Sequence, residues 1–441
     1  MTPSSLHTED LGAPPGWSAG RRRLALTLLV GAAILNLVDR QVISILLEPI
    51  KHEFQLSDTQ IGLLTGTAFA LCYALIAFPM ARMLDRGVRR TIYAICIGVW
   101  SVSTMLAGMA SSFAMLLLTR LGVAVGESSA GPAQQSLVAD LYPGAKMPWA
   151  MALVNLGAAI GVALSLFLGG WLSQTYGWRM AFLVLGAPGL LIALGIWLAV
   201  PEPPRRTVRG AQVAEAPAPI GEVARALGSS PTYLLMLFAI AGSGFSGFAL
   251  LAWGPSFLIR VHHMPAPMVG LWSGFAAAMG FGLGSLLSGQ LGTVLGRRDI
   301  RWHLRLGGIC NILAAPAGVL MAFSPTAAVA IGAQFIYMLL TTMHVPLVNT
   351  MVQSLAPPRM RAASAATTGF VQTIAGVGMG PLLLGVLNDA FRQGHGVEGI
   401  RLSLAWVMPA VALAGVALLA ANRWAPSEYA RAATRPAPDE A

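Results

Sequence analysis

Charged side chains are scarce in this chain. Asp, Glu, Lys and Arg make up 10% of its 441 residues, whereas 56% of the residues are hydrophobic. A soluble domain usually carries about 25% charged residues. A chain this apolar cannot cover its surface in water, which excludes an ordinary soluble protein and predicts that lipid is its solvent.

Lysine and cysteine are nearly absent as well. The two lysines, Lys51 and Lys146, do not follow glycine in the pattern of a phosphate-binding loop, so we expect no ATP site. The cysteines Cys72, Cys96 and Cys310 all fall inside apolar runs and are interpreted as buried small side chains. No nucleophile–base or metal-ligand pattern stands out, so the chain is predicted not to be an enzyme and to hold no cofactor and no metal.

Long apolar runs are what the chain has instead. They recur from Leu24 to Trp424, and each is about 20 residues long, enough for a helix to cross a bilayer. They lack the alternation of barrel strands, so helices are expected. The twelve predicted spans are 22–47, 58–81, 91–110, 113–137, 148–172, 179–199, 232–258, 268–291, 303–323, 326–351, 360–387 and 401–422.

The net charge of +10 is distributed as a membrane topology signal. Arginines gather in short clusters between apolar runs, as in cytoplasmic loops, and this placement argues against nucleic-acid binding. Arg21-Arg22-Arg23 precedes the first run as in a signal peptide, but no cleavage site follows, so the run is interpreted as the first span. The bias of Lys and Arg between loops predicts that both termini are cytoplasmic.

The spans divide six and six around a polar stretch rich in Pro, Ala and Arg. The segment 61–66 matches 269–274 at an offset of 208 residues, and the same offset carries Arg89-Arg90 onto Arg297-Arg298. Parallel six-span halves of this kind are a known transporter architecture, although chance similarity between Gly/Leu-rich helices is the alternative. The predicted parts are an N-terminal tail 1–21, a bundle 22–199, a cytoplasmic linker 200–230, a second bundle 231–422 and a C-terminal tail 423–441.

The segment Asp85-Arg86-Gly87-Val88-Arg89-Arg90, at the end of the second span, resembles the loop signature of the major facilitator superfamily. Ala81 stands where that signature usually has glycine. In the second half Gly289, Arg297 and Arg298 are kept, but Thr293 replaces the acid. The resemblance implies an all-α membrane protein with the major facilitator fold, which has twelve transmembrane helices in two six-helix bundles.

Two further stretches resemble the spinster-type branch of that superfamily, whose members are linked to sphingolipid and lysophospholipid transport. One comprises 36–41 and 49–58; the other comprises Arg120, 126–128 and 139–142. The branch implies a secondary transporter that moves an amphipathic, lipid-like molecule by alternating access. Drug/proton antiporters often carry Gly-Pro in the fifth span, and here Val162 follows Gly161, which weakens that interpretation.

Four charged residues lie deep within the predicted spans: Asp39, Arg40, Arg120 and Glu127. A charge at this depth costs several kcal/mol unless it faces a cavity or a partner. An Asp39–Arg120 pair across the first and fourth spans is geometrically reasonable, with Glu127 nearer the cytoplasm. Since burial favours a neutral carboxyl and a nearby guanidinium favours a charged one, Glu127 and Asp39 are predicted to carry protons. A fixed salt-bridge network is the alternative.

The arginines have a predicted role in holding charge. Arg120 is permanently charged and is expected to bind Asp39, Glu127 or an anionic head group in turn. Arg40 is a candidate coupling partner, or a brace, because it points about 100° away from Asp39 on the helix. At the cytoplasmic end of the second span, Asp85 with Arg86, Arg89 and Arg90 is expected to form a gate, although the arginines alone also fit simple topology signalling.

The second half carries no charge deep in its spans, which suits an apolar part of a substrate. Possible cavity-lining residues there are Trp253, Tyr337, His344, Phe370 and Gln372, although ordinary interhelical packing explains any single one of them. His344 could relay a proton, but no acid lies near it in the sequence.

Together these features predict a proton-coupled, multi-pass transporter that acts as a monomer, with an amphipathic small molecule, protons and the bilayer as its partners. The abundance of Arg, Ala and Gly favours a bacterial inner membrane. A proton symporter or antiporter of a small organic anion or drug is the alternative within the same class. A membrane-embedded lipid-modifying enzyme is the alternative from another class, and it lacks a catalytic cluster.

Overall fold

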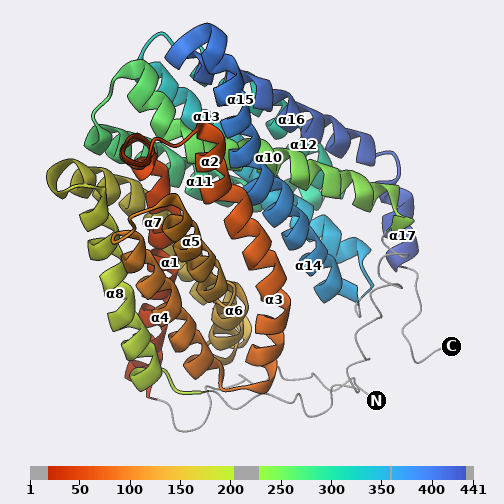
Figure 1. The fold of residues 1–441 in the computed structure, drawn as a ribbon. Helices are drawn as coiled ribbons and strands as arrows, with labels where there is room; N and C mark the ends of the chain where they lie inside the picture. The colour runs from red at the N-terminus through yellow and green to blue at the C-terminus, as the bar shows by residue number, and fades with distance from the viewer. Residues whose placement is uncertain (1–17, 203–227, 358–359, 434–441) are drawn as a thin grey trace, which may run out of the picture.

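The structure is a computed structural model that describes residues 18–202, 228–357 and 360–433. Most of the predicted linker and both predicted tails therefore lie outside the described residues. Within the described ranges the regular secondary structure is entirely helical. Long helices run back and forth through the molecule in two groups, one from each half of the chain (Figure 1).

The N-terminal half forms six spans. Its helices are α1 (Ala19–Phe54), α2 (Asp58–Gly62) continued by the π-helix η1 (Leu63–Thr67) and α3 (Ala68–Arg86), α4 (Arg89–Ala107), α5 (Phe113–Glu127) with α6 (Ala130–Leu141), α7 (Met147–Tyr176) and α8 (Trp178–Ala199). Here α2–η1–α3 make the second span, and α5 and α6 make the fourth.

The C-terminal half repeats this plan. Its helices are α10 (Pro231–His262), α11 (Ala266–Gly296), α12 (Trp302–Ala322), α13 (Ala327–Leu355), α14 (Arg361–Val371) continued by the π-helix η4 (Gln372–Met379) and α15 (Gly380–His395), α16 (Gly399–Ala421) and α17 (Ala425–Ala433). The short α17 adds a helix within the predicted C-terminal tail.

Length and hydropathy support the membrane assignment. Eleven stretches of the described chain are long and apolar enough to cross a bilayer, and the last, Arg361–Ala421, contains two consecutive spans. The predicted fold of twelve transmembrane helices in two bundles is thereby confirmed. Several helices run beyond the predicted spans, because hydropathy declines at the first charged turn while the backbone remains helical; α1, for example, continues to Phe54 rather than ending at residue 47.

The two ends of the molecule differ in how the halves meet. We call the end where α2 begins the Asp58 end, and the end where α8 finishes and α10 begins the linker end. One buried hydrophobic cluster at the Asp58 end contains Leu46 and Leu64 from the first half and Val269 and Leu384 from the second. At the linker end each half has a separate buried cluster. The halves are therefore packed together at the Asp58 end and parted at the linker end.

Glycines allow this close approach. A Cβ on Gly62 would lie 2.5 Å from the backbone oxygen of Pro381, and one on Gly270 would lie 2.1 Å from that of Leu166. Both distances are shorter than side chains tolerate, so these helix pairs touch backbone to backbone. The helices α2 and α15 lie side by side at the top of Figure 1, and α3 and α14 extend from them toward the linker end.

A π-helical segment interrupts the second span of each half. The segments η1 and η4 face one another across the halves, where the hydroxyl of Thr67 donates to the backbone oxygen of Gly378 over 2.8 Å. Wide turns of this kind are rare inside α-helices and frequently mark functional sites.

Candidate transport site

The charged residues predicted within the first half form one buried cluster. Arg40 on α1 holds Glu127 at the end of α5, with Nη2 at 2.5 Å and Nε at 2.7 Å from the same oxygen, Oε2. The Glu127 side chain is fully buried, whereas that of Arg40 is 23% exposed. The other carboxylate oxygen, Oε1, is buried, and Asn36 is the further side chain that acts on this carboxylate as a hydrogen-bond donor. Glu127 is thus a buried acid whose one ion-pair partner is Arg40 among the described residues.

Asp39 and Arg120 do not form the expected ion pair in this conformation. The Arg120 guanidinium instead donates to the backbone oxygens of Asp39 and Arg40, at 3.3 and 3.4 Å. Asp39 is 1% exposed and makes no ion pair in the described part of the chain, with the side chains of Thr104 and Trp100 as the hydrogen-bonding groups that act on its carboxylate. A carboxylate taken out of water without a counter-charge is costly, so Asp39 is a candidate for the proton-coupling role.

One aromatic ring lies close to both guanidiniums. Phe69 on α3 lies 5.0 Å from Arg40 and 5.4 Å from Arg120, measured from ring centroid to guanidinium carbon, and the Tyr73 ring lies 5.6 Å from Arg40. The π faces attract both cations. The ring therefore helps to stabilise two like charges in one buried site.

A two-residue turn interrupts the fourth span directly after Glu127. The α-helix α5 ends there and α6 begins at Ala130, although Phe113–Leu141 runs on as one membrane-spanning stretch. The hydroxyls of Ser128 and Ser129 bond back to the backbone oxygens of Val125 and Gly126. These bonds satisfy two buried hydroxyls that would be costly to leave without partners.

Arg40 lies where the two halves meet. It lines a crevice of about 30 Å³ together with Phe69 from its own half and Phe248, Val377 and Pro381 from the other. A change in the Arg40–Glu127 pair would therefore directly alter the contact between the two halves. Arg120, which is 3% exposed, lies behind this surface.

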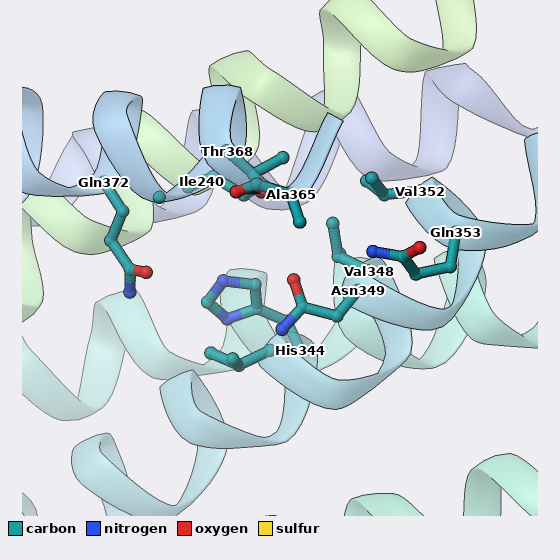
Figure 2. A pocket seen from close by; sticks show the side chains of 11 residues that line it. Ile240, His344, Val348, Asn349, Val352, Gln353, Ala365, Thr368 and Gln372 are labelled. Carbon is teal, nitrogen blue, oxygen red and sulfur yellow. Dashed lines mark hydrogen bonds between the residues drawn. The ribbon is translucent and has the colours of Figure 1, made fainter. Parts of the chain in front are cut away.

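A second cavity lies within the C-terminal half, between α10, α13 and the span made by α14 and η4. Its volume is about 290 Å³. Figure 2 shows polar side chains around it: His344, Asn349 and Gln353 from α13, with Thr368 and Gln372 from the opposing span. None of its lining residues is Asp, Glu, Lys or Arg. The pocket lining is charge-free, as expected for the C-terminal half, but it combines polar side chains with aliphatic ones and is not wholly apolar.

The predicted cavity-lining residues separate into two groups. His344 and Gln372 line the pocket, and sequence reasoning missed Asn349 and Gln353 beside them. Trp253 and Tyr337 are 0% exposed, and the Trp253 indole donates to the backbone oxygen of Pro381 over 2.9 Å, so neither presents surface to a cavity in this conformation. Phe370 is 56% exposed on α14 but does not line this pocket.

A charged cluster at the Asp58 end was also missed. Arg260 on α10 makes two hydrogen bonds to Asp58, at 2.5 and 2.9 Å, and one of 2.8 Å to Glu48. Lys51 also pairs with Asp58. On the other side Asp389 caps α2, accepting from the backbone nitrogens of Asp58 and Thr59 at 3.0 and 2.8 Å. These contacts tie the two halves together by charge.

The predicted cytoplasmic gate residues lie at the linker end. Arg89 is buried and pairs within its own half with Asp140 at 2.6 Å and Glu202 at 2.9 Å. Arg90 donates through its backbone nitrogen to Glu202 over 2.9 Å. Asp85 and Arg86 are exposed, and no contact to either residue is recorded in the described part of the chain. The lack of a recorded contact to Asp85 is consistent with the separation of the two halves at the linker end.

Two six-helix bundles that close at one end and part at the other, around buried charges at their contact, define a membrane transporter of the major facilitator type. A model of the Major Facilitator Superfamily matches residues 29–381. The chain therefore belongs to this superfamily.

Individual relatives agree with the resemblance found in the sequence. The chain is 31% identical over 412 residues to an MFS-type efflux pump of Mycolicibacterium smegmatis, covering 93% of each chain. It is 27% identical over 382 residues to protein spinster homolog 1 of Xenopus tropicalis, covering 82% of this chain and 72% of the relative.

A solved structure is similar over nearly the whole chain. It is the crystal structure of a bacterial homolog of the human lysosomal transporter spinster in an inward-facing, unoccupied conformation. The TM-score is 0.84 at 27% identity, covering 96% of this chain and 100% of that one. The chain is a spinster-type transporter of the major facilitator superfamily and not an enzyme.

Proposed function

We propose that this protein is a proton-coupled secondary transporter that moves an amphipathic, lipid-like molecule across a bacterial inner membrane by alternating access. The observation that carries the proposal is the Arg40–Glu127 pair beside an unpaired, buried Asp39. Protonation of Glu127 would release Arg40 at the surface where the halves meet. An anionic head group could then take the place of the carboxylate on the guanidinium.

The conformation supports an assignment of sides. Parting at the linker end resembles the inward-facing state named for the bacterial spinster homolog, and the arginine bias favours a cytoplasmic linker. The Asp58 end would then face outward. In the opposite state, Asp85 would dock across the closed linker end as a latch, while the contacts of Arg260 would open.

A small organic anion or a drug remains the second candidate substrate. The relative in Mycolicibacterium smegmatis is described as an efflux pump and is 31% identical. The uncharged hydrogen-bonding side chains of the pocket also suit a small hydrophilic compound.

The coupling mechanism is tested with reconstituted vesicles. Movement of a fluorescent lysophospholipid, and separately of ethidium as a drug probe, is followed with and without an imposed pH gradient. Glu127→Gln and Asp39→Asn mimic the protonated acids, so each variant should bind and exchange substrate but lose the response to the gradient. Glu53→Gln is the matched control, because Glu53 pairs with Arg179 at 2.6 Å away from the buried cluster. A double mutant Asp39→Asn/Glu127→Gln that responds to the gradient as the parent does would refute carboxylate coupling.

A further inference from the structure

The pocket in the C-terminal half is lined by hydrogen-bonding groups that the protein leaves unused. The side-chain amides of Asn349, Gln353 and Gln372 make no hydrogen bond to any described residue. Each carboxamide offers two donors and an acceptor. In Figure 2 these amides lie around a common space with the His344 ring between them. Polar groups gathered around a cavity without protein partners are what a polar ligand requires.

His344 adds an acceptor to this set. Its Nδ1 contacts the backbone oxygen of Thr341. A carbonyl oxygen can only accept, so Nδ1 carries the proton, and in the neutral ring Nε2 is left as an acceptor. The Thr368 hydroxyl is engaged with the backbone oxygen of Ala365 at 2.8 Å, which leaves its oxygen lone pairs available. The lining therefore presents both donors and acceptors.

The absence of charged lining residues limits the chemical class of the ligand. No Asp, Glu, Lys or Arg lines the pocket, so an ion placed there would lose its water without gaining a counter-charge. Uncharged groups with several hydroxyl or amide functions match the lining. The volume of about 290 Å³ is just below the range for small-molecule sites, roughly 300–1,000 Å³, so the pocket accommodates a head-sized group and not a long chain.

The pocket is connected to the charged site along one helix. Gln372 is the first residue of η4, and Val377 of the same segment lines the crevice with Arg40. The pocket and the crevice that contains Arg40 are therefore both lined by residues of η4, which makes them neighbouring candidates for two groups of one molecule.

We propose that this pocket is the subsite for an uncharged part of the transported molecule that bears several hydroxyl or amide groups, while the anionic part of the same molecule binds at Arg40. The inference rests on the proposed function, since it assigns a substrate class to that transporter. A hydroxylated lipid head group and a sugar acid both carry this chemistry, and the experiment separates them.

Equilibrium binding in nanodiscs tests the subsite without any gradient. The lipid pair is lysophosphatidylglycerol, which has hydroxyls on its head group, and dodecyl phosphate, which has none. The soluble pair is gluconate, which is hydroxylated, and hexanoate, which is not. Gln372→Leu and Asn349→Leu should each weaken binding of the hydroxylated probe about tenfold and leave its unhydroxylated partner unchanged. Gln393→Leu is the control, because Gln393 is an exposed glutamine in the same span and outside the pocket.

The result also identifies the source of the hydroxylated group. Selective loss for lysophosphatidylglycerol assigns a lipid head group, and selective loss for gluconate assigns a sugar acid. Three results would overturn the proposed subsite. The variants could weaken both members of a pair equally, or neither variant could have an effect. The third is that no hydroxylated probe binds the parent at millimolar concentration. Because nanodiscs hold no pH gradient, these failures leave the coupling proposal to its own vesicle test.

Discussion

Arg260 and Asp58 meet in a two-pronged ion pair across the line between the two halves of the molecule. The Asp58 side chain is 1% exposed and that of Arg260 is 12% exposed. Bidentate arginine–carboxylate contacts are among the stronger polar interactions, and here the pair is shielded from water. It therefore stabilises the conformation that is closed at the Asp58 end, and its loss should shift the population toward the other state.

Arg260→Gln should open the Asp58 end. Spin labels at Gln55 and Gln393, which are exposed there on opposite halves, report the separation in a background without cysteine. We expect the longer-distance population to rise several-fold, because the closing ion pair is lost while Asp58 and Glu48 remain. Arg179→Gln is the control, since Arg179 pairs with Glu53 at the same end but within one half. Identical distance distributions in all three proteins would exclude a gating role.

Arg40 and Glu127 should be energetically coupled. Arg40→Gln leaves the Glu127 carboxylate buried without its counter-charge, which should destabilise the fold by about 3 kcal/mol. The double variant Arg40→Gln/Glu127→Gln should recover most of that loss, because no buried charge is left unpaired. Thermal unfolding in detergent measures the cycle.

The exposed Arg305–Asp299 pair, at 3.8 Å, provides the comparison for this cycle. Arg305→Gln should change stability by less than about 1 kcal/mol, as surface pairs usually do. A cycle at Arg40 and Glu127 that shows no more coupling than the surface pair would contradict a buried, functional interaction.

Arg120→Ala should abolish binding of an anionic substrate. The side chain lies behind Arg40 and holds the backbone of α1 at Asp39 and Arg40 through two hydrogen bonds, so its loss removes a buried positive charge and also loosens the helix. Binding of lysophosphatidylglycerol by purified protein is the measurement, with thermal unfolding as a check on folding. Equal binding by variant and parent would reduce Arg120 to a structural brace.

The proposed orientation can be tested in intact cells. With the three native cysteines replaced, Val88→Cys in the α3–α4 turn should be protected from an impermeant thiol reagent, and Gln55→Cys at the Asp58 end should be labelled. Both positions are exposed in the structure, so access depends on the side of the membrane alone. Labelling of Val88→Cys from outside would reverse the assignment.

The helices could be predicted because each one contains its own apolar run. An apolar run of span length specifies a membrane helix without reference to any other part of the chain. The same reliance on apolar runs is why the charged cluster at the Asp58 end was not predicted. Glu48 and Arg260 fall outside the predicted spans because charges end a hydropathy window, although both helices continue past them.

The partners within the site were harder to predict, because they depend on how helices are rotated against each other. The sequence placed Asp39 and Arg120 at similar depth, with Glu127 nearer the cytoplasm, but did not determine which face of α1 meets α5. Neighbouring residues on a helix point about 100° apart, so the rotation of α1 about its axis decides whether Asp39 or Arg40 is the side chain that meets a partner. Two lining residues of the pocket, His344 and Gln372, were predicted, but the pocket as a whole was not, since its amides are scattered singly through apolar helices.

The facing π-helical segments have a consequence for the alignment of these helices. A π-turn takes in one residue more than an α-turn would, so the side chains beyond it are out of phase with those before it. In the second span of each half, one stripe of side chains therefore packs against the partner half at the Asp58 end, and a different stripe is presented toward the linker end. Removing one residue from η1 or η4 would bring the stripes back into phase and turn the linker-end side chains of that helix toward new neighbours. The extra residue in each helix thus sets which side chains a solute meets as it passes from one end of the molecule to the other.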